Sequence, residues 1–242
     1  PVLELQSQAV DLLRATARSE SFADLLAGPG RRRLSSTVLK ELEDVVGALA
    51  VEMEHEEIST TGCWLQYATA LVNLTTALCK RGRKFFASLI SSSRDREGHT
   101  MGNGAAVLVE LLMQVVSYIE KGGEDDIENG SVSSRPSPSL LSELRKLLKL
   151  TLELLHWLKF HPLGPSDVVV YKKDFAPDDV RGGGGTPRVS KAFLRALGDR
   201  KECFLACCFR VSQWGAEGAC DRVAIFDEGL VRMTKRILED PR

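Results

Sequence analysis

The chain is dominated by runs of apolar residues that recur at helical spacing and end at Gly, Pro or polar breaks. The longest run carries a wide leucine face over residues 140–158. Ser137 precedes it as a side chain that can cap a helix, and Pro138 occupies the first helical position. His161-Pro162 follows, and proline stops a helix there. This pattern predicts a long helix in the protein core.

Other apolar runs with the same period follow one another along the chain. They cover residues 3–13, 21–27, 38–53, 63–79, 105–119, 189–197, 201–214 and 221–238. Strand composition is found only at Val168–Tyr171. Successive helices of this kind bury their apolar stripes against neighbours in sequence. We therefore expect an all-α fold, either an array of stacked helical hairpins of solenoid type or a globular helical bundle.

Three segments between these runs have the composition of loops. The stretches 91–104, 122–136 and 181–188 are polar or glycine-rich and lack an apolar period. We expect flexible loops there, and a break between two helices at Ser59–Gly62. The helices are expected to form one domain over residues 1–242.

The composition is that of an ordinary globular protein. Of the 242 residues, 43% are hydrophobic, and the net charge is −1. These values argue against disorder and against attraction of the whole surface to nucleic acid or anionic membrane. Charged and polar residues interrupt the longest apolar runs, so we expect no membrane-spanning helix. Six cysteines are too few for a disulfide scaffold and favour a reducing compartment, the cytosol or the nucleus.

The segment Ala68–Thr75 contains an apolar helix that ends in the pair Asn73-Leu74. It resembles the inner helix of an armadillo repeat, and the rhythm of helix pairs around it is similar to that of armadillo and HEAT solenoids. The resemblance covers about one repeat, and no second Asn-Leu pair follows at the usual period of about 40–47 residues. It implies stacked helical hairpins whose concave surface binds another protein. Asn73 is the motif position that carries over.

The cysteine and histidine spacings do not match the motifs of metal sites. Structural zinc sites repeat pairs of ligands two to four residues apart. The cysteines near the end of the chain follow a different pattern, at Cys203, Cys207, Cys208 and Cys220. We expect them to be buried core thiols. His55 could begin a zinc-protease helix, but Ser59 stands where the second histidine would be needed.

Further motifs point away from catalysis. His156 and His161 flank the end of the leucine-rich run, where we expect them to cap the helix. Gly102-Asn103-Gly104 lacks the third glycine and the preceding strand of a dinucleotide site, so we expect a loop. The sequence predicts no enzyme, no cofactor, no metal and no small-molecule substrate. A site assembled from distant residues remains an alternative, with Cys203 and His156 as the first pair to inspect.

Two basic clusters interrupt the otherwise balanced charge. They consist of Arg31, Arg32 and Arg33, and of Lys80, Arg81, Arg83 and Lys84. We expect each cluster in an exposed turn between helices. If they share a face, they could bind phosphates, although no aromatic residues interleave with them to stack on bases.

These observations predict a noncatalytic scaffold or adaptor domain that binds a protein partner, such as a peptide or helical segment, through a helix-lined surface. The candidate contact residues are both basic clusters and a groove lined by Trp64, Tyr67, Asn73 and Lys80. A helical nucleic-acid-binding protein that uses the basic clusters is the alternative.

Overall fold

A computed structural model describes residues 2–16, 32–55, 58–81, 104–124, 137–160, 190–214 and 228–240, together with residues 85 and 89. Every regular element in these ranges is an α-helix, which confirms the predicted fold class. The helices are α1 (Val2–Thr16), α3 (Arg32–His55), α4 (Ile58–Arg81), α6 (Gly104–Glu124), α7 (Pro138–Phe160), α10 (Ser190–Leu197), α11 (Arg200–Gln213) and α12 (Glu228–Glu239).

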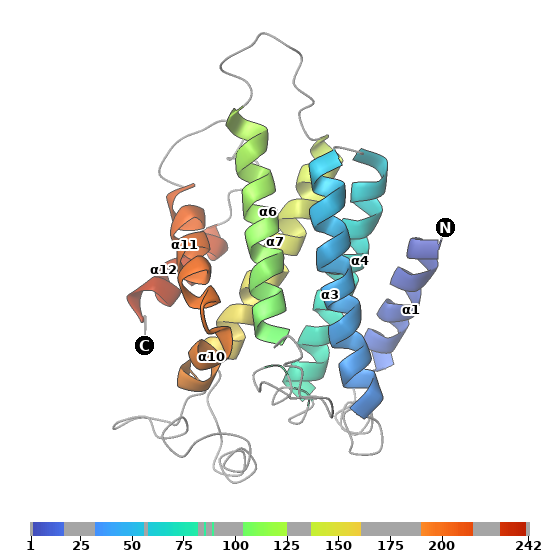
Figure 1. The fold of residues 1–242 in the computed structure, drawn as a ribbon, viewed down its shortest axis with the longest axis horizontal. Coiled ribbons are helices and arrows are strands. Elements are labelled where there is room, and N and C mark those ends of the chain that lie inside the picture. Colours follow the sequence, from blue (N-terminus) through green and yellow to red (C-terminus); the bar gives the residue numbers. More distant parts are fainter. Residues whose placement is uncertain are drawn as a thin grey trace.

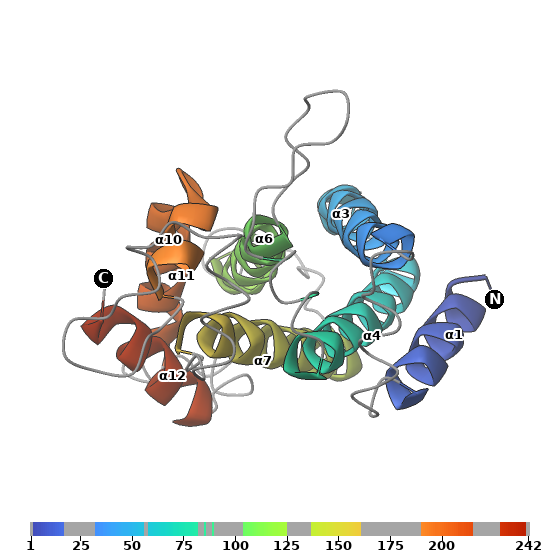
Figure 2. The same ribbon diagram turned by 90° about the horizontal axis from the view of Figure 1, so that it is seen from below.

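The helices form an array of antiparallel pairs. The pairs α3/α4, α6/α7 and α11/α12 pack side by side, so that α3, α6 and α11 form one layer and α4, α7 and α12 form the other (Figures 1 and 2). Helix α1 packs against α4 at one end of the array, and α10 contacts α6 and α7 near the other end. Each pair thus buries its apolar faces against its neighbours.

Two ion pairs show that α6 and α11 run in the same direction. Glu110 Oε2 lies 3.4 Å from Arg200 Nε, and Glu120 Oε2 lies 3.1 Å from Arg210 Nη1. The acidic and the basic partners are therefore equally spaced along their helices. This parallel register is what stacking of successive hairpins produces, because the first helix of each hairpin then has the same orientation.

One cluster of buried apolar side chains runs through the whole array, from Val10 on α1 to Ile237 on α12. The leucine-rich helix α7 is confirmed as a core element, since most of its leucines are almost inaccessible to solvent: Leu140, Leu144, Leu147, Leu148, Leu152, Leu154, Leu155 and Leu158. Full burial of one such side chain stabilises the fold by about 1.5–3 kcal/mol.

The start of α7 also agrees with the sequence. Pro138 is its first residue, and Ser137 Oγ accepts a hydrogen bond from the main-chain N–H of Leu140 at 3.3 Å. The hydroxyl thereby satisfies one of the N–H groups that have no partner within the helix. The predicted N-cap is confirmed.

Three predicted boundaries are wrong, since the helices extend beyond them. Helix α3 starts at Arg32, before the expected caps at Ser35 and Ser36. Helix α4 starts at Ile58, so the expected break at Ser59–Gly62 is helical. Thr61 is fully buried there, and packing of this turn outweighs the cost of about 1 kcal/mol for a helical glycine. Helix α6 continues to Glu124, into the expected loop.

Two glycines are required by local geometry. Gly104 is the first residue of α6, and a Cβ atom there would collide with the side chains of Leu39 and Leu89. Gly198 has a φ of +52°, which favours glycine, and lies in the turn between α10 and α11. The expected helix at 21–27, the strand-like Val168–Tyr171 and most of the three expected loops lie outside the described residues.

Candidate functional site

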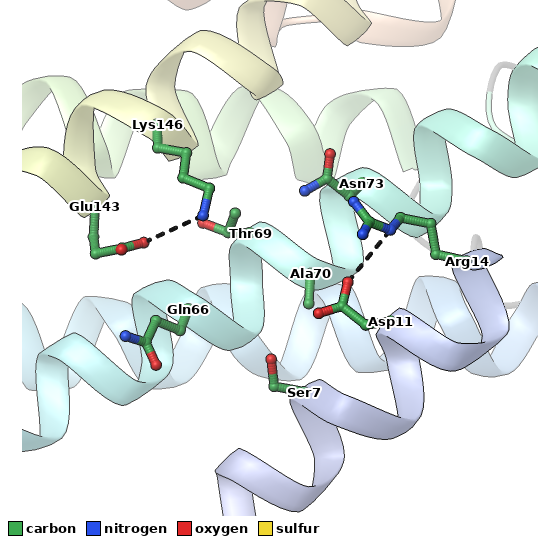
Figure 3. A pocket seen from close by; sticks show the side chains of 9 residues that line it. All are labelled: Ser7, Asp11, Arg14, Gln66, Thr69, Ala70, Asn73, Glu143 and Lys146. Carbon is green, nitrogen blue, oxygen red and sulfur yellow. Dashed lines mark ion pairs between the residues drawn. The ribbon is translucent and has the colours of Figure 1, made fainter.

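A polar hollow lies between α1, α4 and α7 (Figure 3). Its volume is about 280 Å³. One face of α4 forms its floor, since the lining residues there recur at the spacing of successive helical turns. The lining consists of Gln66, Thr69, Ala70 and Asn73 from α4, of Ser7, Asp11 and Arg14 from α1, and of Glu143 and Lys146 from α7. We call this site the polar hollow.

The charges in the polar hollow are balanced and come from its two walls. On α1, Arg14 Nε lies 3.3 Å from Asp11 Oδ1. On α7, Lys146 Nζ lies 4.0 Å from Glu143 Oε2. Each pair joins residues three apart on its own helix, so neither pair ties one wall to the other. The hollow thus presents two cations and two carboxylates around a neutral, polar floor.

Thr69 on the floor has an unused hydroxyl group. Thr69 is only 4% exposed, and its Oγ1 atom has no hydrogen-bond partner among the described residues. Most buried polar groups are hydrogen-bonded, and leaving one unpaired costs about 1–3 kcal/mol. Figure 3 shows Thr69 between α4 and the Lys146 side chain of α7. Oγ1 itself has almost no exposed surface, so a bound molecule would satisfy this hydroxyl only once the Thr69 side chain turns toward the hollow.

A second surface feature lies on the opposite side of α1. Val2, Leu5 and Leu12 are 68%, 66% and 68% exposed, and Ala9 between them is also exposed. These four residues follow one another at intervals of three and four, so they form a single stripe. Leu3, Val10 and Leu13 pack against the core instead. We call the exposed stripe the α1 outer face.

The expected groove residues do not share one surface. Tyr67 is buried, and its Oη donates a hydrogen bond to Glu41 Oε2 on α3 at 3.0 Å. Burial, followed by this bond, raises the pKa of Tyr67 to about 12. Trp64 is half-buried with its ring centroid 6.4 Å from that of Tyr67, while Lys80 is exposed near the end of α4. Of the four, Asn73 alone lines the polar hollow.

The basic clusters are described only in part. Arg32 and Arg33 lie in the first turn of α3, and Arg81 is the last residue of α4, so they are helical rather than in turns. Arg31, Arg83 and Lys84 lie outside the described residues. The alternative in which the two clusters share a face and bind phosphates stays a hypothesis.

Three of the five described thiols agree with the interpretation as core residues, whereas Cys63 is exposed. Cys79, Cys207 and Cys208 are buried. Burial raises the pKa of all three thiols, that of Cys207 to about 11. They are therefore protonated at neutral pH and are poor nucleophiles. Cys203 is half-buried, and Cys220 lies outside the described residues. Within the described ranges, no three His, Cys, Asp or Glu side chains come together as metal ligands would.

His156 does not cap α7 as expected. Burial lowers its pKa, and the nearby Arg236 and Lys159 lower it further, so the ring is neutral at pH 7. Its Nε2 atom is buried and accepts no hydrogen bond from the described residues, and its ring lies 4.8 Å from that of Phe160. Burial first, and then the neighbouring cations, disfavour a positive charge on this ring. His161, the other expected cap, lies outside the described residues.

The sequence analysis named Asn73 as a candidate contact residue but none of the other residues that line the polar hollow. The available signal was the polar stripe Gln66, Thr69 and Asn73 within the otherwise apolar α4. The walls could not be assigned, because nothing in the sequence places residues 7–14 beside residues 143–146.

The chain matches no family model, and no curated protein or solved structure matches it. The resemblance to armadillo and HEAT repeats therefore stays a prediction. Among the described helices, none combines the length and the apolar character needed to cross a bilayer.

Proposed function

We propose that this chain is a noncatalytic helical scaffold or adaptor domain that binds a protein partner through the α1 outer face. One observation carries the proposal. Val2, Leu5 and Leu12 expose about two thirds of their surface along a single stripe at the end of the helical array. Single exposed apolar residues are common on protein surfaces, whereas a contiguous apolar patch typically marks a site of interaction.

The spacing of the stripe defines the chemistry of the partner. Residues 2, 5, 9 and 12 alternate intervals of three and four, which is the pattern by which one amphipathic helix packs against another. Glu4 and Gln8 are exposed along one edge of the stripe. The fitting partner is therefore a helix with an apolar stripe and a basic residue opposite Glu4. A second copy of this chain packed in parallel fits less well, because it would place the same acidic residue opposite Glu4.

The buried thiols also support a binding role rather than a catalytic one. Their raised pKa values keep them protonated, so they are poor nucleophiles. The proposal places the chain in the cytosol or nucleus, where its cysteines stay reduced.

The test compares two substitutions of exposed apolar residues. The double variant Leu5→Gln/Leu12→Gln removes the two leucines of the stripe. The control Val51→Gln changes another exposed apolar residue, on α3, which is 51% exposed. Both should keep the helical content and the melting temperature of the wild type. Proteins captured by immobilised wild type should also be retained by Val51→Gln, and should be reduced at least tenfold by the double variant.

Two results would contradict this proposal. One is capture of the same proteins at the same level by the double variant. The other is concentration-dependent self-association of the wild type that the double variant abolishes, because that would make a second copy the occupant. Light scattering during size-exclusion chromatography distinguishes the two cases.

A further inference from the structure

We propose that the polar hollow binds a small zwitterion, with a free α-amino acid as the simplest member of that class. This goes beyond the proposed function, because the hollow lies on the other side of α1 from the α1 outer face. Ser7, Asp11 and Arg14 line it, and they recur at i, i+4 and i+7. They are about half a turn away from Leu5 and Leu12.

The size of the hollow sets the size of the ligand. Its volume of about 280 Å³ lies just below the range of roughly 300–1,000 Å³ that is usual for small-molecule sites. A single amino acid fits such a space, whereas a folded segment of a partner protein would not enter it.

The balance of charge selects a ligand that carries both signs. A lone anion would meet Asp11 and Glu143 as well as the two cations, and a lone cation would meet Arg14 and Lys146 as well as the two carboxylates. A zwitterion can place its carboxylate toward the cations and its ammonium group toward the carboxylates. Each charge of the ligand then has a partner of opposite sign.

The two ion pairs of the hollow can open so that their side chains contact a ligand. Arg14 contacts Asp11 through Nε, and Asn73 lines the same hollow. Lys146 and Glu143 are 4.0 Å apart, at the outer limit of an ion pair. The Arg14–Asp11 pair is exposed to solvent, and pairs of this kind contribute only about 0–1 kcal/mol. Glu143 Oε2 is buried, so movement of Lys146 away from it requires another cation in its place, which the ammonium group of the ligand supplies.

The floor supplies the groups that would fix the orientation of the ligand. Thr69 Oγ1 is buried and unpaired among the described residues, so a ligand atom that bonds to it, once the side chain turns toward the hollow, relieves the cost of an unpaired buried hydroxyl. The side-chain amides of Gln66 and Asn73 can each donate and accept hydrogen bonds. The carboxylate of the ligand would lie over Thr69, where Lys146 on one wall and Arg14 on the other can both contact it.

Such a ligand would connect three helices. Helix α1 packs chiefly against α4, and the two ion pairs of the hollow stay within single helices. A molecule held by Arg14, Thr69 and Lys146 joins α1 to α4 and α7. Since a ligand that binds the folded state stabilises it, binding should raise the melting temperature.

The experiment measures melting temperatures of the whole chain with the standard α-amino acids, each at about 10 mM. At least one should raise the melting temperature by about 2–4 °C, as expected for millimolar affinity. The N-acetyl and the amide derivatives of that amino acid, inorganic phosphate, and putrescine each lack one of the two charges and should give no shift. Equal shifts with phosphate or putrescine, or no shift with any amino acid, would overturn the proposal.

A matched pair of variants ties the effect to the hollow. Thr69→Val removes the unpaired hydroxyl in the floor, and Thr75→Val removes another buried, unpaired hydroxyl on α4 that does not line the hollow. Both variants should fold with an unchanged or higher melting temperature without ligand. Thr69→Val alone should weaken binding at least tenfold by isothermal titration calorimetry; equal affinity in both variants would refute the assignment.

A last variant separates this site from the α1 outer face. Leu5→Gln/Leu12→Gln should bind the amino acid as tightly as the wild type does, because neither leucine lines the hollow. Loss of ligand binding in that variant would contradict the placement of the site, whatever its effect on protein partners.

Discussion

The ammonium group of Lys159 on α7 donates a hydrogen bond to the main-chain carbonyl of Ile237 on α12, at a distance of 3.1 Å. It also donates to the carbonyl of Asp240. Lys159 is fully buried, although lysine is almost never buried without partners. The carbonyls at the end of a helix have no partner within that helix, and a cation there is favourable. Lys159 thus caps α12 from a neighbouring helix.

Replacement of Lys159 by Met should loosen α12. The variant leaves the carbonyls of Ile237 and Asp240 without their donor, which should cost about 1–3 kcal/mol in the free energy of unfolding at pH 7. Amide hydrogen exchange should become at least tenfold faster in α12, with little change in α3 and α4. Uniformly faster exchange in all helices would contradict the assignment of Lys159 as a local cap.

The same lysine predicts a dependence of stability on pH. Burial lowers the pKa of Lys159 below its ordinary value of 10.5, so in this range the unfolded chain binds more protons than the folded one. The free energy of unfolding therefore rises as the pH rises from the lowered pKa toward 10.5. Urea denaturation across this range should show that rise in the wild type relative to Lys159→Met. A constant difference between the two proteins would contradict the prediction.

Tyr67 should titrate later than an ordinary tyrosine. Burial and the hydrogen bond to Glu41 raise its pKa from 10.0 to about 12. The folded chain keeps this proton longer, so the contribution of Tyr67 to stability is complete below pH 10 and is lost as the pH rises toward 12. Ultraviolet absorption, compared with Tyr67→Phe, isolates its titration. Glu41→Gln should lower the pKa while leaving it above 10, because burial remains.

Two glycine substitutions should have opposite effects. Gly104→Ala introduces a Cβ atom against Leu39 and Leu89, and such overpacking typically costs about 1–3 kcal/mol. Gly47→Ala lies within α3 with no atom within 4 Å of the new Cβ, so it should stabilise the helix by about 0.5–1 kcal/mol. Thermal unfolding followed by circular dichroism measures both effects: the melting temperature should fall for Gly104→Ala and rise for Gly47→Ala. The same sign for both variants would be inconsistent with this packing.

Alkylation should distinguish the thiols. Cys63 is exposed, whereas Cys79, Cys207 and Cys208 are buried with raised pKa values. Iodoacetamide at pH 8 should modify Cys63 first, and the other three should react only after urea unfolds the chain. Mass spectrometry of the digested protein shows the order in which the cysteines are alkylated. Early modification of Cys207 would argue against a packed interface between α6 and α11.

The sequence predicted the helices well where burial follows a simple period. The leucine face of α7 and its cap at Ser137 are local patterns, and both are found as expected. Boundaries were less predictable: α4 starts at Ile58, before the expected break, and Thr61 within that expected break is buried. Helix propensity alone favours a break there.

The candidate sites could be foreseen only in part. A row such as Val2, Leu5 and Leu12 is visible in the sequence, but which stripe of α1 packs against α4 depends on the fold. Likewise, the polar residues of α4 do not reveal that Arg14 and Lys146 stand on either side of them. Charge pairs on separate helices come together only through packing of the array.

The cap on α12 has a consequence for the way the chain folds during synthesis. Lys159 and Ile237 are 78 positions apart, an interval that a ribosome covers in about 4–16 s at about 5–20 residues per second. Throughout that time α7 can pair with α4 and α6, while the ammonium group that will become buried still needs water. The contact between α7 and α12 therefore forms after α7 has packed against α4 and α6. In nascent chains that stop before Asp240, the ammonium group of Lys159 should stay in contact with water.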